Sequence, residues 1–145
     1  MSKVNEIISH LRQDSRSSLV PISHQTKIPV STLYDQIRKL SHDQVIKKFT
    51  SWVDFSKLGY SHHSKIVLMV DCKERQILLD FLKQCPAVNS ISKVNHGFDY
   101  MVELVHKDVK EYSLFMEELK DKFLIINLHE YQILEEIEKE KFLTA

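Results

Sequence analysis

The sequence predicts an α+β fold in two parts, a helical N-terminal part followed by a sandwich whose strands and helices follow the order βαββαβ. Three observations lead to this prediction. Apolar residues of the first 40 positions recur at helical spacing, residues 65–70 form a segment of strand length that is apolar from Ile66 onward, and strand and helix patterns alternate from there to residue 137. The chain has 145 residues but only 2 Gly and 3 Pro, which argues against long flexible linkers.

The composition is that of a soluble globular protein, with 43% hydrophobic and 28% charged residues. No run approaches the roughly 20 apolar residues of a membrane span, and the first residues lack the apolar core of a signal peptide. We therefore expect a cytoplasmic protein that does not enter the membrane. Cys72 and Cys85 form no CxxC pattern, so they are expected to be reduced and without a metal or redox role; a disulfide in a thermophile's cytoplasm is the alternative.

Two short amphipathic helices are expected first. Apolar side chains at helical spacing predict a helix from Val4 to about Gln13. A second helix is expected from a cap at Ser17–Ser18 to about Lys27, where Ile28–Pro29 ends it because the residue before a proline is pushed out of the α region. Both helices would support a third.

The third predicted helix spans residues 30–40 and has two different faces. One face is an apolar stripe formed by Val30, Leu33, Ile37 and Leu40. The other face carries hydroxyl, aromatic and cationic groups that suit a DNA major groove, which makes the three helices a helix-turn-helix. Its candidate DNA contacts are Ser31, Thr32, Tyr34, Gln36, Arg38 and Lys39.

The segment after this helix is expected to complete a winged helix-turn-helix. A strand that forms the wing is predicted to begin at Val45-Ile46 and Phe49. Lys47 and Lys48 lie in this strand and are candidates for contacts with DNA phosphates.

The charges are divided unevenly along the chain. Residues 1–50 hold 8 Lys+Arg against 4 Asp+Glu, and the remainder holds 12 against 16, although the net charge of the whole chain is zero. Such an asymmetry is typical of a nucleic-acid-binding domain joined to a domain with a different function. The alternatives are a chance surface composition, and a solvated helix face on which Asp35 pairs with Arg38 or Lys39.

A connector at residues 51–60 leads into the sandwich. The predicted elements are the strand Lys65–Val70, the helix Lys73–Cys85, the strands Val88–Val94 and Tyr100–Val105, the helix Val109–Phe123 and a final strand within Ile125–Ile137. The inward positions of the two helices are Ile77, Leu78, Phe81, Leu82 and Cys85, and Val109, Tyr112, Met116, Leu119 and Phe123. This order gives a ferredoxin-like sandwich, an antiparallel four-stranded sheet with both helices on one face. The expected domains are 1–50 and 61–145.

The first sandwich strand is apolar on both faces. Alternate residues of a strand point to opposite sides, so Val67 and Met69 cannot share the side of Ile66, Leu68 and Val70. An exposed apolar face normally indicates a partner, and a second copy is the simplest one. We therefore expect a homodimer through the open sheet face, whose two recognition helices would contact two DNA half-sites about one helical turn apart, or a multiple of it.

Short motifs in a fixed order run along almost the whole chain, from about Val4 to Leu143. They are Asp14-Ser15-Arg16, Ile37-Arg38-Lys39-Leu40, Val45-Ile46 with Phe49, Val53-Asp54, Leu58-Gly59, Phe98-Asp99-Tyr100 and the segment Tyr131 to Ile137. With these motifs in this order, the chain resembles the Lrp/AsnC regulators, also called feast/famine regulators. The resemblance implies a winged helix-turn-helix joined to a ligand-sensing domain of the RAM type. It also implies a dimer, or a tetramer or octamer made as a ring of dimers, that binds promoter DNA.

The resemblance further implies where an effector binds. In these regulators a small effector, often an amino acid, sits between neighbouring dimers against the turn before the third sandwich strand. The matching candidate ligand residues are Asn95, His96, Gly97, Phe98, Asp99 and Tyr100. The usual turn has Gly and a small polar residue where this chain has His96-Gly97, so the imidazole would fill the pocket or select a different effector. Lys27 in place of the usual turn glycine would cost about 1 kcal/mol, and Val4 replaces an acidic residue.

No catalytic residue, metal ligand or cofactor is expected. The eight histidines show no HxxxH or HxH spacing, and the chain lacks a glycine-rich phosphate loop and a nucleophile elbow. Two alternatives stay open. One is an enzyme like the siroheme decarboxylases, which resemble the same architecture; the cation-bearing third helix argues against it because an enzyme would have no reason to keep that helix. The other is an effector-binding partner protein without DNA binding.

Overall fold

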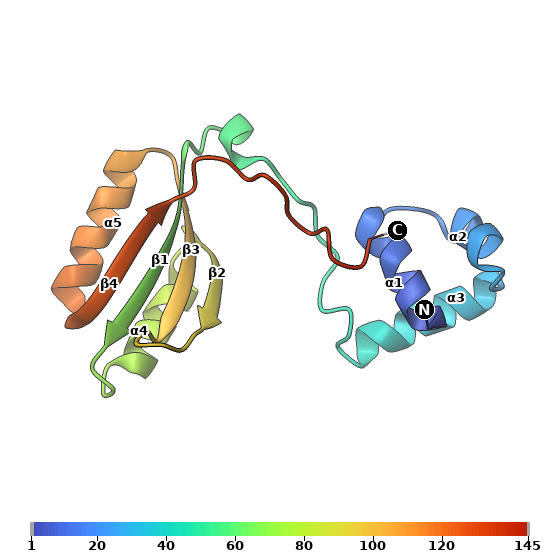
Figure 1. Ribbon diagram of the computed structural model, residues 1–145, viewed down its shortest axis with the longest axis horizontal. Coiled ribbons are helices and arrows are strands. Elements are labelled where there is room, and N and C mark those ends of the chain that lie inside the picture. The colour runs from blue at the N-terminus through green and yellow to red at the C-terminus, as the bar shows by residue number, and fades with distance from the viewer. Residues whose placement is uncertain (1, 145) are drawn as a thin grey trace. The chain divides into compact units, whose positions relative to one another are not determined.

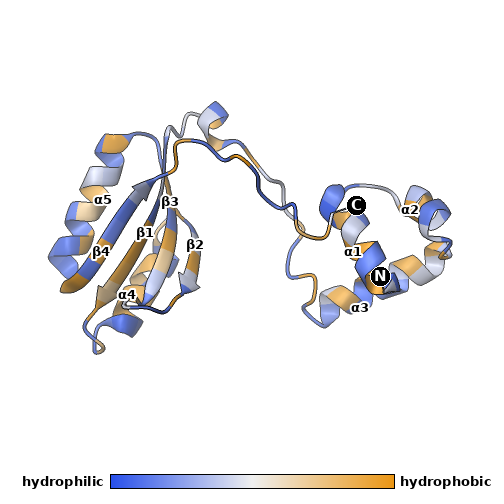
Figure 2. Cartoon of the chain, in the orientation of Figure 1, coloured by the Kyte–Doolittle hydropathy of each residue, from blue (hydrophilic) through white to orange (hydrophobic). Residues whose placement is uncertain are grey.

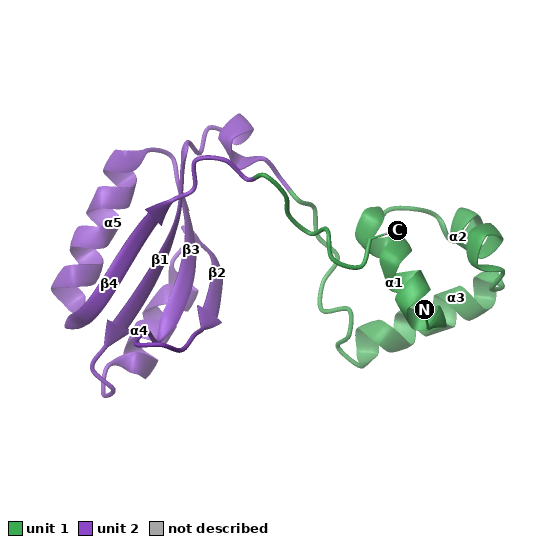
Figure 3. Ribbon diagram, viewed as in Figure 1, with its two compact units in different colours: residues 1–52, 137–145 green, residues 53–136 purple. Residues whose placement is uncertain are grey.

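The computed structural model describes residues 2–144, which form two compact units (Figure 3). Unit 1 contains the chain up to Trp52 together with the segment from Ile137 onward, and unit 2 is Val53–Glu136. The sequence led us to expect a second domain of 61–145, but the segment after Glu136 packs with the first unit. The reason is a pair of contacts from Arg12, whose Nε donates to the carbonyl of Phe142 at 2.7 Å and whose Nη2 lies 2.9 Å from Glu140 Oε2.

Unit 1 contains the three expected helices, α1 (Lys3–Gln13), α2 (Leu19–Thr26) and α3 (Val30–His42) (Figure 1). Their shared core consists of Ile7, Leu11, Ile22, Ile28 and Leu33. Val30 departs from the expected apolar stripe, since its side chain is 41% exposed while Leu33 and Leu40 are buried. Val30 is the first residue of α3, so helix packing covers the stripe from Leu33 onward and leaves the helix start free.

The expected wing strand does not form. Residues 43–54 are irregular, and within the described chain the first strand begins at His62. The physical reason lies at the end of α3, where the N–H groups of Val45 and Ile46 both donate to the carbonyl of Leu40, at 2.9 and 3.0 Å. Gln44, with φ of 58°, turns the chain in the left-handed region to make this possible. The backbone groups that a strand would need are therefore used to end the helix.

Unit 2 has the expected βαββαβ order. A short 3-10 helix, η1 (Phe55–Leu58), precedes the elements β1 (His62–Val70), α4 (Arg75–Gln84), β2 (Val88–Lys93), β3 (Tyr100–His106), α5 (Val109–Lys122) and β4 (Ile125–Gln132). The sheet is antiparallel with the strand order β2-β3-β1-β4, as in a ferredoxin-like sandwich. Both helices contribute to one core with the sheet, through Leu78 and Leu82 of α4 and Phe115, Met116 and Leu119 of α5.

Three details of unit 2 differ from the expectation. Ile77 and Val109 were expected to face inward but are 63% and 64% exposed, because both lie in the first turn of their helices, whereas Leu78 and Phe115 further along are buried. The last strand ends at Gln132 rather than running toward Ile137. One further backbone bond follows, from the N–H of Ile133 to the carbonyl of His63 at 2.8 Å, and beyond it the sheet offers no strand to pair with.

The sheet has one covered and one open face, as the sequence predicts. Ile66, Leu68 and Val70 are fully buried on the helix side. Val67, on the opposite side, pairs with Met101 of β3 and with His129 of β4. The second half of β1, from Ile66 to Val70, is therefore apolar on both faces, and Figure 2 shows this half of the strand in the hydrophobic colour. The open face is the part of the sheet that its own helices leave without a cover.

Candidate DNA-binding face and candidate ligand site

The turn between α2 and α3 fixes how the third helix begins. Thr26 donates its hydroxyl to the carbonyl of Ile22 at 2.8 Å and accepts a long bond, 3.4 Å, from the N–H of Ile28. Lys27 between them adopts the left-handed conformation, with φ of 60°. The turn thus leads directly into α3 with its polar face turned outward.

The outer face of α3 carries most of the predicted DNA contacts. Ser31, Thr32, Tyr34, Arg38 and Lys39 are all exposed. Tyr34 is 58% exposed, which is high for an aromatic side chain and leaves its ring free to contact a partner.

Several details define this face further. Among residues 2–144, no ion pair joins Asp35 to either neighbouring cation, so the pairing considered from the sequence does not occupy Arg38 or Lys39. His42, whose side chain is 87% exposed, lies one turn after Arg38 on the same face. His42 was not among the contacts predicted from the sequence, although its i+4 spacing from Arg38 would have been a signal.

Three of the predicted DNA contacts lie elsewhere. Gln36 has a buried Oε1 with no hydrogen-bond partner in the described structure, so its side chain turns toward the packed side of α3. Lys47 and Lys48 are exposed, but they lie in the irregular segment after α3 rather than in a wing strand.

The predicted ligand residues form the turn between β2 and β3 and the start of β3. His96 and Gly97 both have positive φ angles, 57° and 84°, and are exposed together with Asn95. Glycine adopts this backbone conformation at little cost, whereas His96 is strained. Phe98 is half-buried and meets His129 edge-on, with ring centroids 5.4 Å apart. The turn therefore has an exposed tip and an anchored second half.

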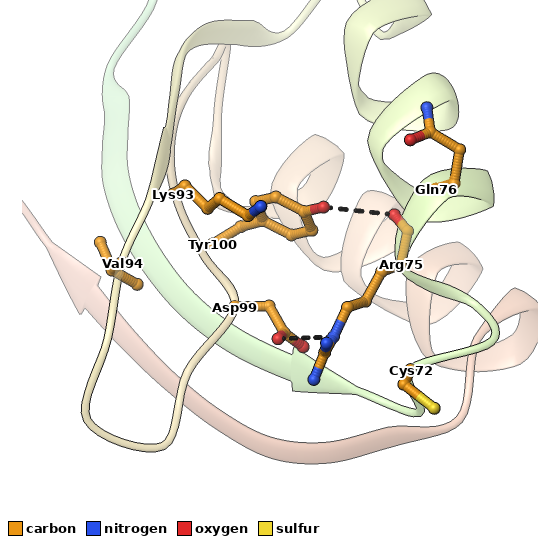
Figure 4. A pocket seen from close by; sticks show the side chains of 7 residues that line it. All are labelled: Cys72, Arg75, Gln76, Lys93, Val94, Asp99 and Tyr100. Atoms are coloured by element: carbon orange, nitrogen blue, oxygen red, sulfur yellow. Dashed lines mark hydrogen bonds and ion pairs between the residues drawn. The ribbon is translucent and has the colours of Figure 1, made fainter.

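Asp99 holds the turn to the rest of unit 2. Its Oδ2 accepts the N–H of Val70 at 2.9 Å, and its Oδ1 lies 2.9 Å from Arg75 Nε (Figure 4). Its own N–H donates to the carbonyl of Leu68 at 2.9 Å, and its carbonyl accepts the N–H of Val94 at 3.0 Å. The side chain is 12% exposed. Asp99 thus ties together the ends of β1 and β2 and the start of α4.

A cavity of about 440 Å³ opens beside Asp99. Its walls are Cys72, Arg75, Gln76, Lys93, Val94, Asp99 and Tyr100 (Figure 4). Only Asp99 and Tyr100 of these were predicted from the sequence. The predicted topology could have indicated the others, because the end of β2, the start of α4 and the turn before β3 all lie at the same end of the strands in a ferredoxin-like sheet.

A second polar cluster lies inside unit 2, near the start of α5. His62 and His106 are opposite each other on β1 and β3, are each 6% exposed, and contact the ring of Tyr112 with centroids 4.4 and 5.7 Å away. Burial lowers the pKa of both histidines, while Glu111 opposes the effect at His106. Burial and a hydrogen bond to Glu130 raise the pKa of Tyr112. His62 Nε2 and His106 Nδ1 find no hydrogen-bond partner among the described residues.

Two other kinds of site are absent from residues 2–144. No group of three or more His, Cys, Asp or Glu side chains in this range is arranged to hold a metal ion. None of the described helices combines the length and the apolar character that crossing a membrane requires.

Relatives with curated names share much of this chain. No protein-family model matches it. The HTH-type transcriptional regulator FL11 of Pyrococcus horikoshii is 30% identical over 112 residues, which are 77% of this chain and 74% of that protein. The transcriptional regulator AzlB of Bacillus subtilis is 26% identical over 113 residues, 76% of this chain and 72% of that protein. These names support a regulator, and none of them supports the siroheme decarboxylase alternative.

Solved structures share the fold over nearly the whole chain. LrpC of Bacillus subtilis superposes with a TM-score of 0.84 at 19% identity and covers 95% of this chain and 96% of that one. A transcriptional regulator of Neisseria meningitidis, solved as a complex with L-Met, gives a TM-score of 0.85 at 15% identity and covers 96% of this chain and 92% of that one. The predicted resemblance is thus confirmed by sequence and fold together, and the chain belongs to the Lrp/AsnC family of transcriptional regulators.

Proposed function

We propose that the protein regulates transcription by placing the outer face of α3 in the major groove of double-stranded DNA. The observation that carries this proposal is the exposure of Tyr34, Arg38 and Lys39 on one helix whose opposite side is buried. Arg and Lys neutralise phosphates and bind guanine edges, and a hydroxyl or aromatic group adds contacts that depend on the sequence. A regulator that binds chromosomal DNA acts in the cytoplasm, which is where we propose that this protein is found.

A homodimer would bring two copies of α3 to the DNA. The open face of the sheet supports it, because Met101, which is 38% exposed, lies there beside the more buried Val67 without a helix over the pair. A symmetric contact through this face would bury apolar surface on both copies. Further association of dimers into a tetramer or octamer would use other surfaces of unit 2.

The turn at residues 95–100 is the proposed effector site. Its exposed tip, with two residues at positive φ, offers backbone groups to a ligand or to a neighbouring dimer. The regulator of Neisseria meningitidis with the same fold was solved with L-Met, which supports a small effector for the present chain. We further propose that the protein is not an enzyme.

The test removes both cations of α3. Arg38→Ala with Lys39→Ala should weaken promoter binding and lower the slope of log affinity against log salt by about 0.9 for each phosphate that the variant no longer neutralises. Fluorescence anisotropy at four salt concentrations measures both quantities. Lys83→Ala with Lys120→Ala removes two exposed lysines from unit 2 and serves as the matched control. Equal affinity of the α3 variant and the control would show that α3 does not contact DNA.

A further inference from the structure

The cavity beside Asp99 carries an excess of positive charge. Arg75 and Lys93 enter its wall from α4 and β2, and Asp99 is the single carboxylate of the lining (Figure 4). Lys93 lies opposite Tyr100 in the β2–β3 register, so both side chains are on the helix side of the sheet, where the cavity opens. Lys93 makes no ion pair in the described structure.

The carboxylate of Asp99 is already committed. One oxygen accepts the N–H of Val70 and the other is paired with Arg75 Nε, and the group is 12% exposed. Arg75 is 46% exposed, and its Nη groups are not used by the bond to Asp99, which involves Nε. Among the ionised groups of the lining, Lys93 and the Nη groups of Arg75 are therefore free to bind an anion, whereas the carboxylate of Asp99 is not free to bind a cation.

This asymmetry decides which ligands suit the cavity. An amino acid brings an ammonium group, which would face two cations and, among the side chains of the lining, would find only the neutral oxygens of Gln76 and Tyr100 as uncommitted acceptors. A carboxylic acid without an amino group has no such conflict, and two carboxylates could meet the two cations separately. The volume of about 440 Å³ and the side chains of Val94 and Tyr100 in its wall also leave room for a carbon skeleton, which inorganic phosphate lacks.

We propose that the cavity lined by Arg75, Lys93 and Tyr100 binds a small organic acid that carries carboxylates but no ammonium group, such as a 2-oxo acid or a dicarboxylate. This inference rests on the proposed effector function of the adjoining turn and names a ligand class for it. Binding itself is a property of unit 2. It can therefore be measured without DNA, and the two proposals can fail separately.

The test compares ligands that differ in one group. Isothermal titration of the full chain with 2-oxoglutarate, succinate, L-glutamate and inorganic phosphate at low salt gives four affinities. We expect 2-oxoglutarate to bind about tenfold or more tightly than L-glutamate, which differs from it by an ammonium in place of the keto oxygen, because one charge-assisted contact is of that size. Phosphate should bind more weakly than 2-oxoglutarate and succinate, the two diacids without an ammonium group.

Variants locate the site. Lys93→Gln should weaken 2-oxoglutarate about tenfold, whereas Lys83→Gln, which changes an exposed lysine near the end of α4, should leave it unaltered. Circular dichroism checks that both variants are folded. The proposal is overturned if L-glutamate or phosphate binds as tightly as 2-oxoglutarate, if neither diacid binds, or if the two lysine variants behave alike. The promoter affinity of the ligand-free protein, measured in parallel, reports on the proposed function independently.

Discussion

Replacement of Asp99 by alanine should destabilise unit 2 by about 2–3 kcal/mol, because it removes two bonds at once. The carboxylate accepts the N–H of Val70 at 2.9 Å and pairs with Arg75 Nε at 2.9 Å. The loss therefore falls on the junction of β1, α4 and β3.

The two bonds contribute unequally. Val70 is fully buried, so its N–H would lose this acceptor at a position that water does not reach, at a cost of about 1–3 kcal/mol. Arg75 is 46% exposed, so solvent screening limits the ion pair to about 0.5–1 kcal/mol. Asp99→Asn keeps an oxygen for the N–H of Val70 and should cost about 1 kcal/mol or less.

Urea unfolding followed by far-ultraviolet circular dichroism measures these differences. The protein concentration must be held fixed, because any association of chains adds to the apparent stability. Glu118→Ala removes an exposed carboxylate from α5 and is the control, with an expected change within about 0.5 kcal/mol. A loss below about 0.5 kcal/mol for Asp99→Ala would refute the anchoring role that its contacts indicate.

Two more predictions concern strain and protonation. Lys27→Gly should stabilise unit 1 by about 0.5–1 kcal/mol. This value is the strain of the left-handed conformation that the substitution relieves, minus the extra conformational entropy that glycine gives the unfolded chain. An unchanged melting temperature would contradict the prediction. His62 and His106 have lowered pKa values, so below about pH 6.5 the unfolded chain binds protons that the folded chain does not, and stability falls as pH falls. Unfolding at pH 7 and pH 5 should show this loss, and the His62→Asn, His106→Asn double variant should show less of it.

Periodicity of apolar residues was enough to predict the order of helices and strands. It worked because most elements bury enough apolar surface to leave a signal in the sequence, as the continuous apolar run Ile66–Val70 does in β1. It failed at the ends of elements. Val30 and Val109 are apolar and in phase, yet each is the first residue of its helix and remains exposed.

Other features depend on contacts that a linear pattern does not contain. The segment from Val45 has strand-forming residues, but its backbone groups are taken by the carbonyl of Leu40. Asp99 was found through the family motif as a candidate ligand residue, and its bonds to Val70 and Arg75 became visible only in the folded chain. The cationic cavity was not predicted because Arg75 and Lys93 are 18 positions apart and line one cavity only through the βαββαβ topology, which a search for short motifs does not use.

The bond from Arg12 to Glu140 also affects when unit 1 can finish folding. These residues are 128 positions apart in the chain, and all of unit 2 is translated between them. At about 5–20 residues per second, the ribosome needs roughly 6–26 s to supply the second partner after the first. A nascent chain can therefore pack α1, α2 and α3 early, but it forms the Arg12–Glu140 contact only after unit 2 has been translated. A newly synthesised chain thus completes unit 1 and unit 2 in the same interval.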